Sequence, residues 1–209
     1  MNTPVETVAA GLLLSGLWMA GLTRIHTKLL LYGLQTVALG VLACLIGVRN
    51  HETALIVAGA AAAVLKGGAV PVFLSGVARR IGCRRDDGLV LAAPLVLLLT
   101  AAALIALVLL RPFGAELARS TDPAVGLVLI GMVLMVSRRL AISQIIGFLV
   151  LENGMFLYSV SQPHSMPLMV ELGVLLDVLA GTMMAGMLVF RIRASFEHID
   201  VSAMRSLRG

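Results

Sequence analysis

The segment Gln144 to Tyr158, with the sequence Gln-Ile-Ile-Gly-Phe-Leu-Val-Leu-Glu-Asn-Gly-Met-Phe-Leu-Tyr, places one carboxylate in the middle of an apolar run. The run covers residues 142–161, which is long enough for a helix to cross a bilayer. Glu152 would then lie near the membrane midplane. A charge there costs roughly 2.5 to 3.5 kcal/mol on insertion scales, so it normally faces protein or water and marks a functional path. We therefore interpret the rest of the chain as a helix bundle built around this acid.

The composition is that of a membrane protein. The chain has 209 residues, of which 59% are hydrophobic and only 13% charged, and its mean hydropathy is +1.02. Apolar runs of this length recur along the chain, which predicts an all-α, polytopic membrane helix bundle. The net charge of +5 would suggest nucleic acid in a soluble protein. Here the basic residues lie in short loops between apolar runs, where membrane orientation explains them better, so we expect no nucleic-acid partner.

Seven transmembrane helices are predicted. The runs are continuous rather than alternating, which excludes the strands of a membrane barrel. Residues 1–190 form a single transmembrane domain in this interpretation, and residues 191–209 form a short cytoplasmic tail. The fifth span is the shortest, and it follows the longest predicted loop, residues 111–122. The spans are residues 7–22, 29–48, 53–77, 88–110, 123–136, 142–161 and 167–190.

The distribution of lysine and arginine predicts the orientation. With seven spans, twelve of these residues fall on one side and only Arg49, Arg111 and Arg119 on the other. Cytoplasmic loops carry such an excess, so the N-terminus is predicted outside and the C-terminus in the cytoplasm of a plasma (inner) membrane protein. Arg138 and Arg139 would snorkel to the cytoplasmic interface. The twelve are Arg24, Lys28, Arg79, Arg80, Arg84, Arg85, Arg138, Arg139, Arg191, Arg193, Arg205 and Arg208.

Four ionisable residues fall inside predicted spans: Lys66, Glu152, Glu171 and Asp177. Glu171 lies only about one turn from a helix end and ranks lowest. Burial in a low dielectric brings carboxyl and ammonium groups toward the range in which protons exchange at neutral pH. The trio Lys66, Glu152 and Asp177 therefore suggests a proton relay. The alternative is structural: Lys66 pairs with one acid and holds helices together.

The sequence around Lys66 predicts irregular backbone. Gly67, Gly68 and Pro71 follow it, which favours a kink or local unwinding beside the charge. The rest of the chain offers little other chemistry. Cys44 and Cys83 belong to no CxxC pattern, and no catalytic motif occurs in a suitable context. We expect no catalytic residue, bound cofactor or metal in this chain.

The segment 144–156 and the last forty residues resemble the hydrogenase-4 component E family, membrane subunits of energy-converting nickel–iron hydrogenase-type complexes. A lysine followed by a proline in the third span, Lys66 and Pro71, fits that family. The last two spans also resemble the K-type small membrane subunit of respiratory complex I and the C subunit of multisubunit sodium/proton antiporters. Leu151, Glu152 and Asn153 match the acid motif of one helix, and Asp177 precedes the basic cluster that closes the next.

The resemblance implies an accessory subunit of a proton-translocating oxidoreductase complex. Its partners would be antiporter-like membrane subunits and a cytoplasmic redox arm carrying iron–sulfur clusters, with a nickel–iron centre where the complex is a hydrogenase. Glu152 and Asp177 would be relay carboxylates, and Lys66 would bias their charge. Two alternatives stay open: a subunit of a cation/proton antiporter without redox partners, and a stand-alone small transporter.

Overall fold

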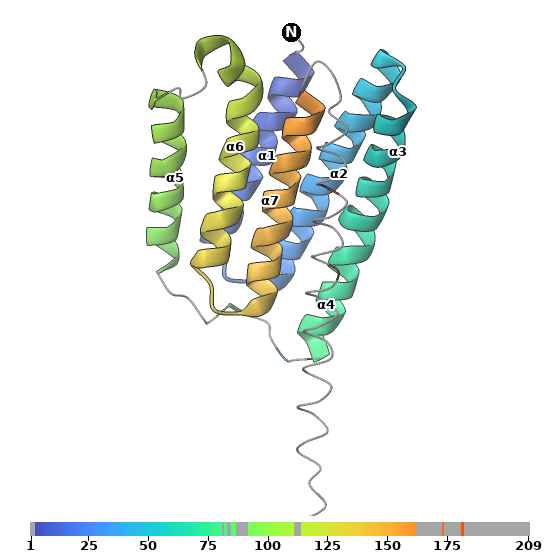
Figure 1. Ribbon diagram of the computed structural model, residues 1–209. Coiled ribbons are helices and arrows are strands. Elements are labelled where there is room, and N and C mark those ends of the chain that lie inside the picture. The colour runs from blue at the N-terminus through green and yellow to red at the C-terminus, as the bar shows by residue number, and fades with distance from the viewer. Residues whose placement is uncertain are drawn as a thin grey trace, which may run out of the picture.

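The computed structural model describes residues 3–80, 82, 85–86, 92–110, 114–161, 173 and 181. This part of the chain is helical and contains no β-strand, which confirms the predicted all-α class (Figure 1). One element, η1, is a π-helix, and it joins α3 and α4 into one continuous helical rod. The elements are α1 (Thr3–Gly21), α2 (Ile25–Asn50), α3 (Thr53–Ala61), η1 (Ala62–Ala69), α4 (Val70–Arg80), α5 (Ala93–Leu110), α6 (Gly114–Val136) and α7 (Ala141–Ser161).

Three of these helical segments are long and apolar enough to cross a membrane: Ile25–Asn50, Thr53–Arg80 and Ala141–Ser161. Three shorter apolar helices accompany them, at Glu6–Gly21, Ala93–Leu107 and Pro123–Val136. Six of the seven predicted spans therefore coincide with helices. The seventh, residues 167–190, lies outside the described residues except for two glycines at 173 and 181, which are helical. The tail at 191–209 also lies outside them.

The predicted loop at residues 111–122 is wrong. Helix α6 begins at Gly114, nine residues before the predicted start of the fifth span at Pro123, and Pro123 lies inside the helix. The residues Ala115-Glu116-Leu117-Ala118 that follow the helix start are strong helix formers. The whole segment 111–122, however, is too polar to be recognised as part of a membrane span. Hydropathy therefore located the apolar part of α6 and missed its first turns.

The helices form a bundle in which α7 packs against α6 and α2, while α1 packs against α2, α5 and α6 (Figure 1). The rod of α3, η1 and α4 runs along the outer side of α2. Helices α6 and α7 approach each other closely at Gly131 and Gly147. A Cβ atom on Gly131 would lie 2.5 Å from the Leu151 nitrogen, and one on Gly147 would lie 2.8 Å from the Met135 nitrogen. Small residues permit such close helix packing in membranes.

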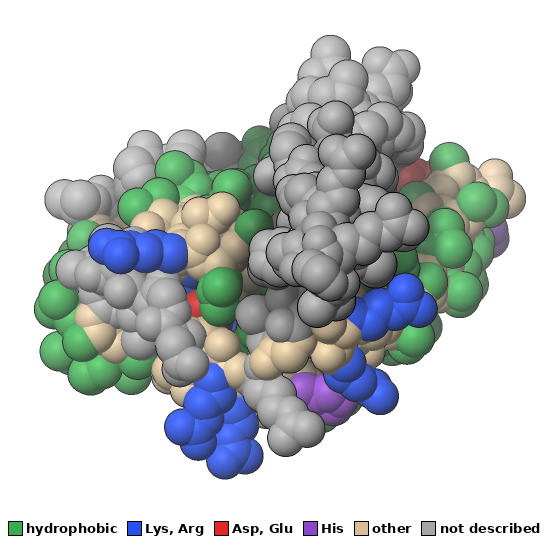
Figure 2. All heavy atoms as spheres, turned by 90° about the horizontal axis from the view of Figure 1, so that it is seen from below, with side chains coloured by type: hydrophobic (Ala, Val, Ile, Leu, Met, Phe, Trp, Pro, Cys, Tyr) green, Lys and Arg blue, Asp and Glu red, His purple; other side chains and the backbone are tan. Residues whose placement is uncertain are grey.

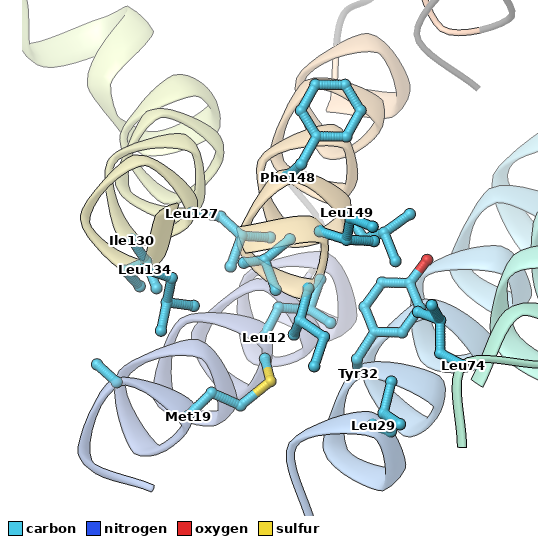
Figure 3. Packing of buried hydrophobic residues seen from close by; sticks show 14 of the residues in the cluster. Leu12, Met19, Leu29, Tyr32, Leu74, Leu127, Ile130, Leu134, Phe148 and Leu149 are labelled. Carbon is cyan, nitrogen blue, oxygen red and sulfur yellow. The ribbon is translucent and has the colours of Figure 1, made fainter. Parts of the chain in front are cut away.

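The core lies between α1, α2, α6 and α7 and reaches α4 through Leu74 (Figure 3). Tyr32 of α2 lies between this leucine and α7, so the rod containing Lys66 is packed onto the main bundle. The large buried hydrophobic residues of the core include Leu12, Met19, Leu29, Tyr32, Leu39, Leu74, Leu127, Ile130, Leu134 and Ile145.

One end of the bundle is held together by a buried charged cluster. The Lys28 Nζ atom lies 2.7 Å from Asp86 Oδ2, and Arg138 Nη1 lies 3.4 Å from the same oxygen. Arg138 Nη2 also donates to the Ala20 carbonyl at 2.6 Å, and the Asp86 N–H donates to the Thr23 carbonyl at 2.8 Å. The cluster thereby joins the α1–α2 turn, the segment before α5 and the α6–α7 turn.

The prediction that Arg138 snorkels to the interface is wrong, because this residue is only 1% exposed. Its neighbour Arg139 is exposed, as predicted. Burial lowers the pKa of the Arg138 guanidinium, and the Asp86 carboxylate opposes that shift. Arginine starts so far above neutral pH that the group stays charged. The buried carboxylate of Asp86 is what makes the inward position of Arg138 possible.

Candidate functional site

Lys66 and Glu152 form an ion pair inside the bundle. The distance from Lys66 Nζ to Glu152 Oε2 is 3.0 Å, and the two side chains are 16% and 2% exposed. Lys66 comes from η1 and Glu152 from the middle of α7, so the pair connects the outer rod to the main bundle. From the sequence, pairing of Lys66 with one acid was the structural alternative to a relay, and the acid was left open. The structure identifies Glu152 as a partner. Asp177 and Glu171 lie outside the described residues.

The predicted irregularity beside Lys66 is present and takes the form of the π-helix η1, Ala62–Ala69. Pro71 has no N–H, so it cannot bond to the carbonyl of Gly67, and its ring would crowd that carbonyl in a regular α-helix. Prolines and π-helical turns both mark breaks in helices, and π-helical turns occur often at functional sites. Helices α2 and η1 are in close contact here, because a Cβ atom added to Gly33 would lie only 2.9 Å from the Gly67 carbonyl oxygen.

A layer of hydrogen-bonded polar side chains extends from the residue next to Glu152. Asn153 Nδ2 donates to Thr36 Oγ1 at 2.8 Å and to Gln35 Oε1 at 3.2 Å. Gln35 Nε2 in turn donates to the Leu12 carbonyl at 2.9 Å and to Ser15 Oγ at 3.1 Å. Gln35, Thr36 and Asn153 are all buried. The layer crosses from α7 through α2 to α1 and fixes the rotation of these three helices.

Sequence reasoning missed Gln35, Thr36 and Ser15 as members of the site. Single neutral polar residues are common in membrane helices, so they gave a weak signal on their own. The available signal was Gln35, a long amide side chain inside an apolar run, because a buried amide needs partners on other helices. Its partner Asn153 is 118 residues away in sequence, and only the fold brings the two together.

The two parts of this site are suited to different chemistry. A carboxylate beside an ammonium can accept or release a proton. The amide groups of Gln35 and Asn153 orient hydrogen bonds but do not exchange protons readily near neutral pH. The polar layer therefore positions α7, and with it Glu152, while Glu152 and Lys66 hold the groups that can change charge.

No protein-family model and no solved structure matches the chain. It is 31% identical over 214 residues to the uncharacterized protein Rv0085 of Mycobacterium tuberculosis, an alignment that covers 98% of this chain and 96% of that protein. The chain belongs to the Rv0085 family.

This Rv0085-family chain is also similar to a named subunit. It is 25% identical over 215 residues to hydrogenase-4 component E of Escherichia coli K12, with 98% of the chain and 97% of component E aligned. The protein of the same name from Shigella flexneri aligns equally well. The resemblance to component E seen in the sequence is thus confirmed as a distant homology over the full length. The similarity to the K-type subunit of complex I stays a prediction.

Proposed function

We propose that this chain is an integral membrane subunit of a hydrogenase-4-like, proton-translocating oxidoreductase complex, in which Glu152, Lys66 and Asp177 belong to a proton relay. The observation that carries the proposal is the 3.0 Å ion pair between the half-buried Lys66 of the outer rod and the buried Glu152 in the middle of the apolar helix α7. Intramembrane charges of this kind are costly and mark ion or proton paths. The distant homology to hydrogenase-4 component E supports the assignment to a multisubunit complex.

In this proposal Glu152 takes up and passes on a proton, and Lys66 responds to the change in charge. Protonation of Glu152 removes the negative charge that compensates the ammonium at 3.0 Å. In a low dielectric the loss of this electrostatic attraction changes the energy of the ammonium strongly. The protonation state of Glu152 and the position of Lys66 are therefore coupled. Lys66 itself lies in the π-helix η1, whose wider turns differ from the regular helices on both sides. Asp177 would be the next carboxylate.

The proposal includes seven spans, an outside N-terminus and a cytoplasmic C-terminus in the plasma (inner) membrane. Support comes from the loops that were predicted to be cytoplasmic. Arg24 and Arg85 form an isolated backbone bridge, and Asp86 binds Lys28 and Arg138. All three loops therefore meet at one end of the bundle, as an alternating path through the membrane requires. Figure 2 shows lysine and arginine side chains around this end.

The partners are tested by purifying the full chain from its native membranes in mild detergent through an affinity tag. We expect antiporter-like membrane subunits and a redox arm with iron–sulfur and nickel–iron proteins to co-purify, as identified by mass spectrometry and metal analysis. Co-purification of antiporter-like subunits without redox proteins would favour the antiporter alternative. Recovery of the chain alone, from membranes in which crosslinking also finds no partner, would contradict a complex.

A further inference from the structure

A basic cleft lies at the same end of the bundle, between the start of α2 and the end of α4. It has a volume of about 760 Å³. Its charged and titratable lining consists of Arg24 and His26 from the α1–α2 region, Arg79 from α4 and Arg85 from the following segment. All four side chains are exposed. The remaining lining residues are neutral, and no aspartate or glutamate is among the lining residues within the described chain.

The positive charge of this basic cleft is not neutralised by its nearest described acid. Asp86 follows Arg85 directly in sequence, but its carboxylate is buried and bound to Lys28 at 2.7 Å and to Arg138 at 3.4 Å. Within the described part of the chain, none of the three arginines of the cleft forms an ion pair with a carboxylate. Three guanidinium groups around one open cavity form a site for an anion, because each can donate paired hydrogen bonds to phosphate or carboxylate oxygens.

The start of α2 adds further donors to the cleft. Arg24 is the N-cap residue of α2, and its side chain makes no capping hydrogen bond. Ile25, His26 and Thr27, the first turn of the helix, also line the cavity. The backbone N–H groups of a first turn have no partner within the helix and carry a partial positive charge. They reinforce the arginines toward an anionic ligand.

An apolar surface continues from the cleft along both helices. On α2, Leu30 and Leu34 follow His26 at spacings of four and eight residues, and they are 57% and 60% exposed. On α4, the exposed Val72 lies three residues before Ser75, which lines the cleft. Residues at these spacings share one helix face. The molecule thus presents a basic pocket at the membrane end and an apolar surface running away from it.

We propose that this basic cleft binds the phosphodiester headgroup of an anionic phospholipid, with the acyl chains lying along the exposed faces of α2 and α4. Basic pockets between membrane helices bind such headgroups, whereas a free phosphate would gain nothing from the apolar surface beside the cleft. The inference uses residues outside the Lys66–Glu152 site and stands independently of the proposed relay.

The test is native mass spectrometry of the delipidated full-length chain with phosphatidylglycerol or phosphatidylcholine of identical acyl chains. We expect phosphatidylglycerol to bind preferentially. The double variant Arg24→Gln/Arg79→Gln should weaken phosphatidylglycerol binding by about tenfold, since each arginine near an anionic headgroup contributes to binding. Arg49→Gln removes an exposed arginine from the last turn of α2, away from the cleft, and should leave binding unchanged. Arg79→Lys, which keeps the positive charge, should retain most of the phosphatidylglycerol binding.

Equal binding of the two lipids, or an equal loss in Arg49→Gln, would overturn the proposal. Displacement of phosphatidylglycerol by millimolar inorganic phosphate would show a site for free anions and would also overturn it. The thermal unfolding of each variant is measured in the same detergent. If the double variant is unfolded, the single variant Arg85→Gln, in a segment outside the helices, replaces it with the same expected direction.

Discussion

Replacing Asp86 with asparagine is expected to destabilise the folded chain by about 3–5 kcal/mol, the usual cost of breaking a buried ion pair from one side. The substitution removes the carboxylate that lies 2.7 Å from Lys28 and 3.4 Å from Arg138. Both cations are 1% exposed and would be left buried without a counter-charge. Since the cluster joins three turns, the loss should loosen the whole end of the bundle.

Unfolding of the full-length chain in mixed micelles, followed by the fluorescence of Trp18, measures this effect. Trp18 is the only tryptophan in the sequence and lies two residues before Ala20, whose carbonyl accepts from Arg138. The matched control is Glu6→Gln, which removes an exposed acid. Adding Lys28→Met to Asp86→Asn should recover part of the stability because one buried cation is removed. A loss below about 1 kcal/mol for Asp86→Asn, in the range of an exposed pair, would contradict the buried cluster.

Replacing Lys66 with methionine is the second change with a large expected effect, about 3–5 kcal/mol while Glu152 stays ionised. The substitution keeps a long apolar stem but removes the ammonium from its position 3.0 Å from Glu152, whose side chain is 2% exposed. The double variant Lys66→Met/Glu152→Gln should cost much less than the sum of its parts. Contacting residues couple by about 0.5–3 kcal/mol in such double-mutant cycles.

A second cycle, with Arg49→Met and Glu6→Gln, provides the control. Both of these residues are exposed, and no ion pair joins them in the described part of the chain. Their effects on unfolding should add within about 0.5 kcal/mol. Additive effects for Lys66 and Glu152 as well would show that the two side chains do not interact in the folded protein.

The sequence predicted the helices well where hydrophobicity is continuous. The spans at 29–48 and 142–161 match α2 and α7 within a few residues, because an apolar run of this length has no other stable form in a bilayer. The start of α6 was missed because residues 114–122 are too polar to belong to an apolar run. The break at Lys66 was predictable, since a proline acts on its own backbone.

The tertiary contacts of charged and polar residues were less predictable. Hydropathy and loop charge predict that Arg138 lies near a membrane interface. They do not predict whether a carboxylate from another loop pairs with it and allows it to be buried. Asp86 supplies that carboxylate. It lies outside all the predicted spans, just before the fourth. The pairing of Gln35 with Asn153 depends on which faces of α2 and α7 meet. Such contacts depend on the packing of helices, which a single sequence does not record.

Proton uptake into inverted membrane vesicles that contain the intact complex tests the central claim most directly. Wild type is compared with Glu152→Gln at matched assembly and matched oxidation of the electron donor, with Glu6→Gln as the exposed control. We expect uptake per donor oxidised to fall by about tenfold or more in Glu152→Gln, because positioned acid–base groups contribute effects of at least this size, and to remain at the wild-type level in the control. Unchanged uptake in Glu152→Gln would contradict the relay and make the Lys66–Glu152 pair structural.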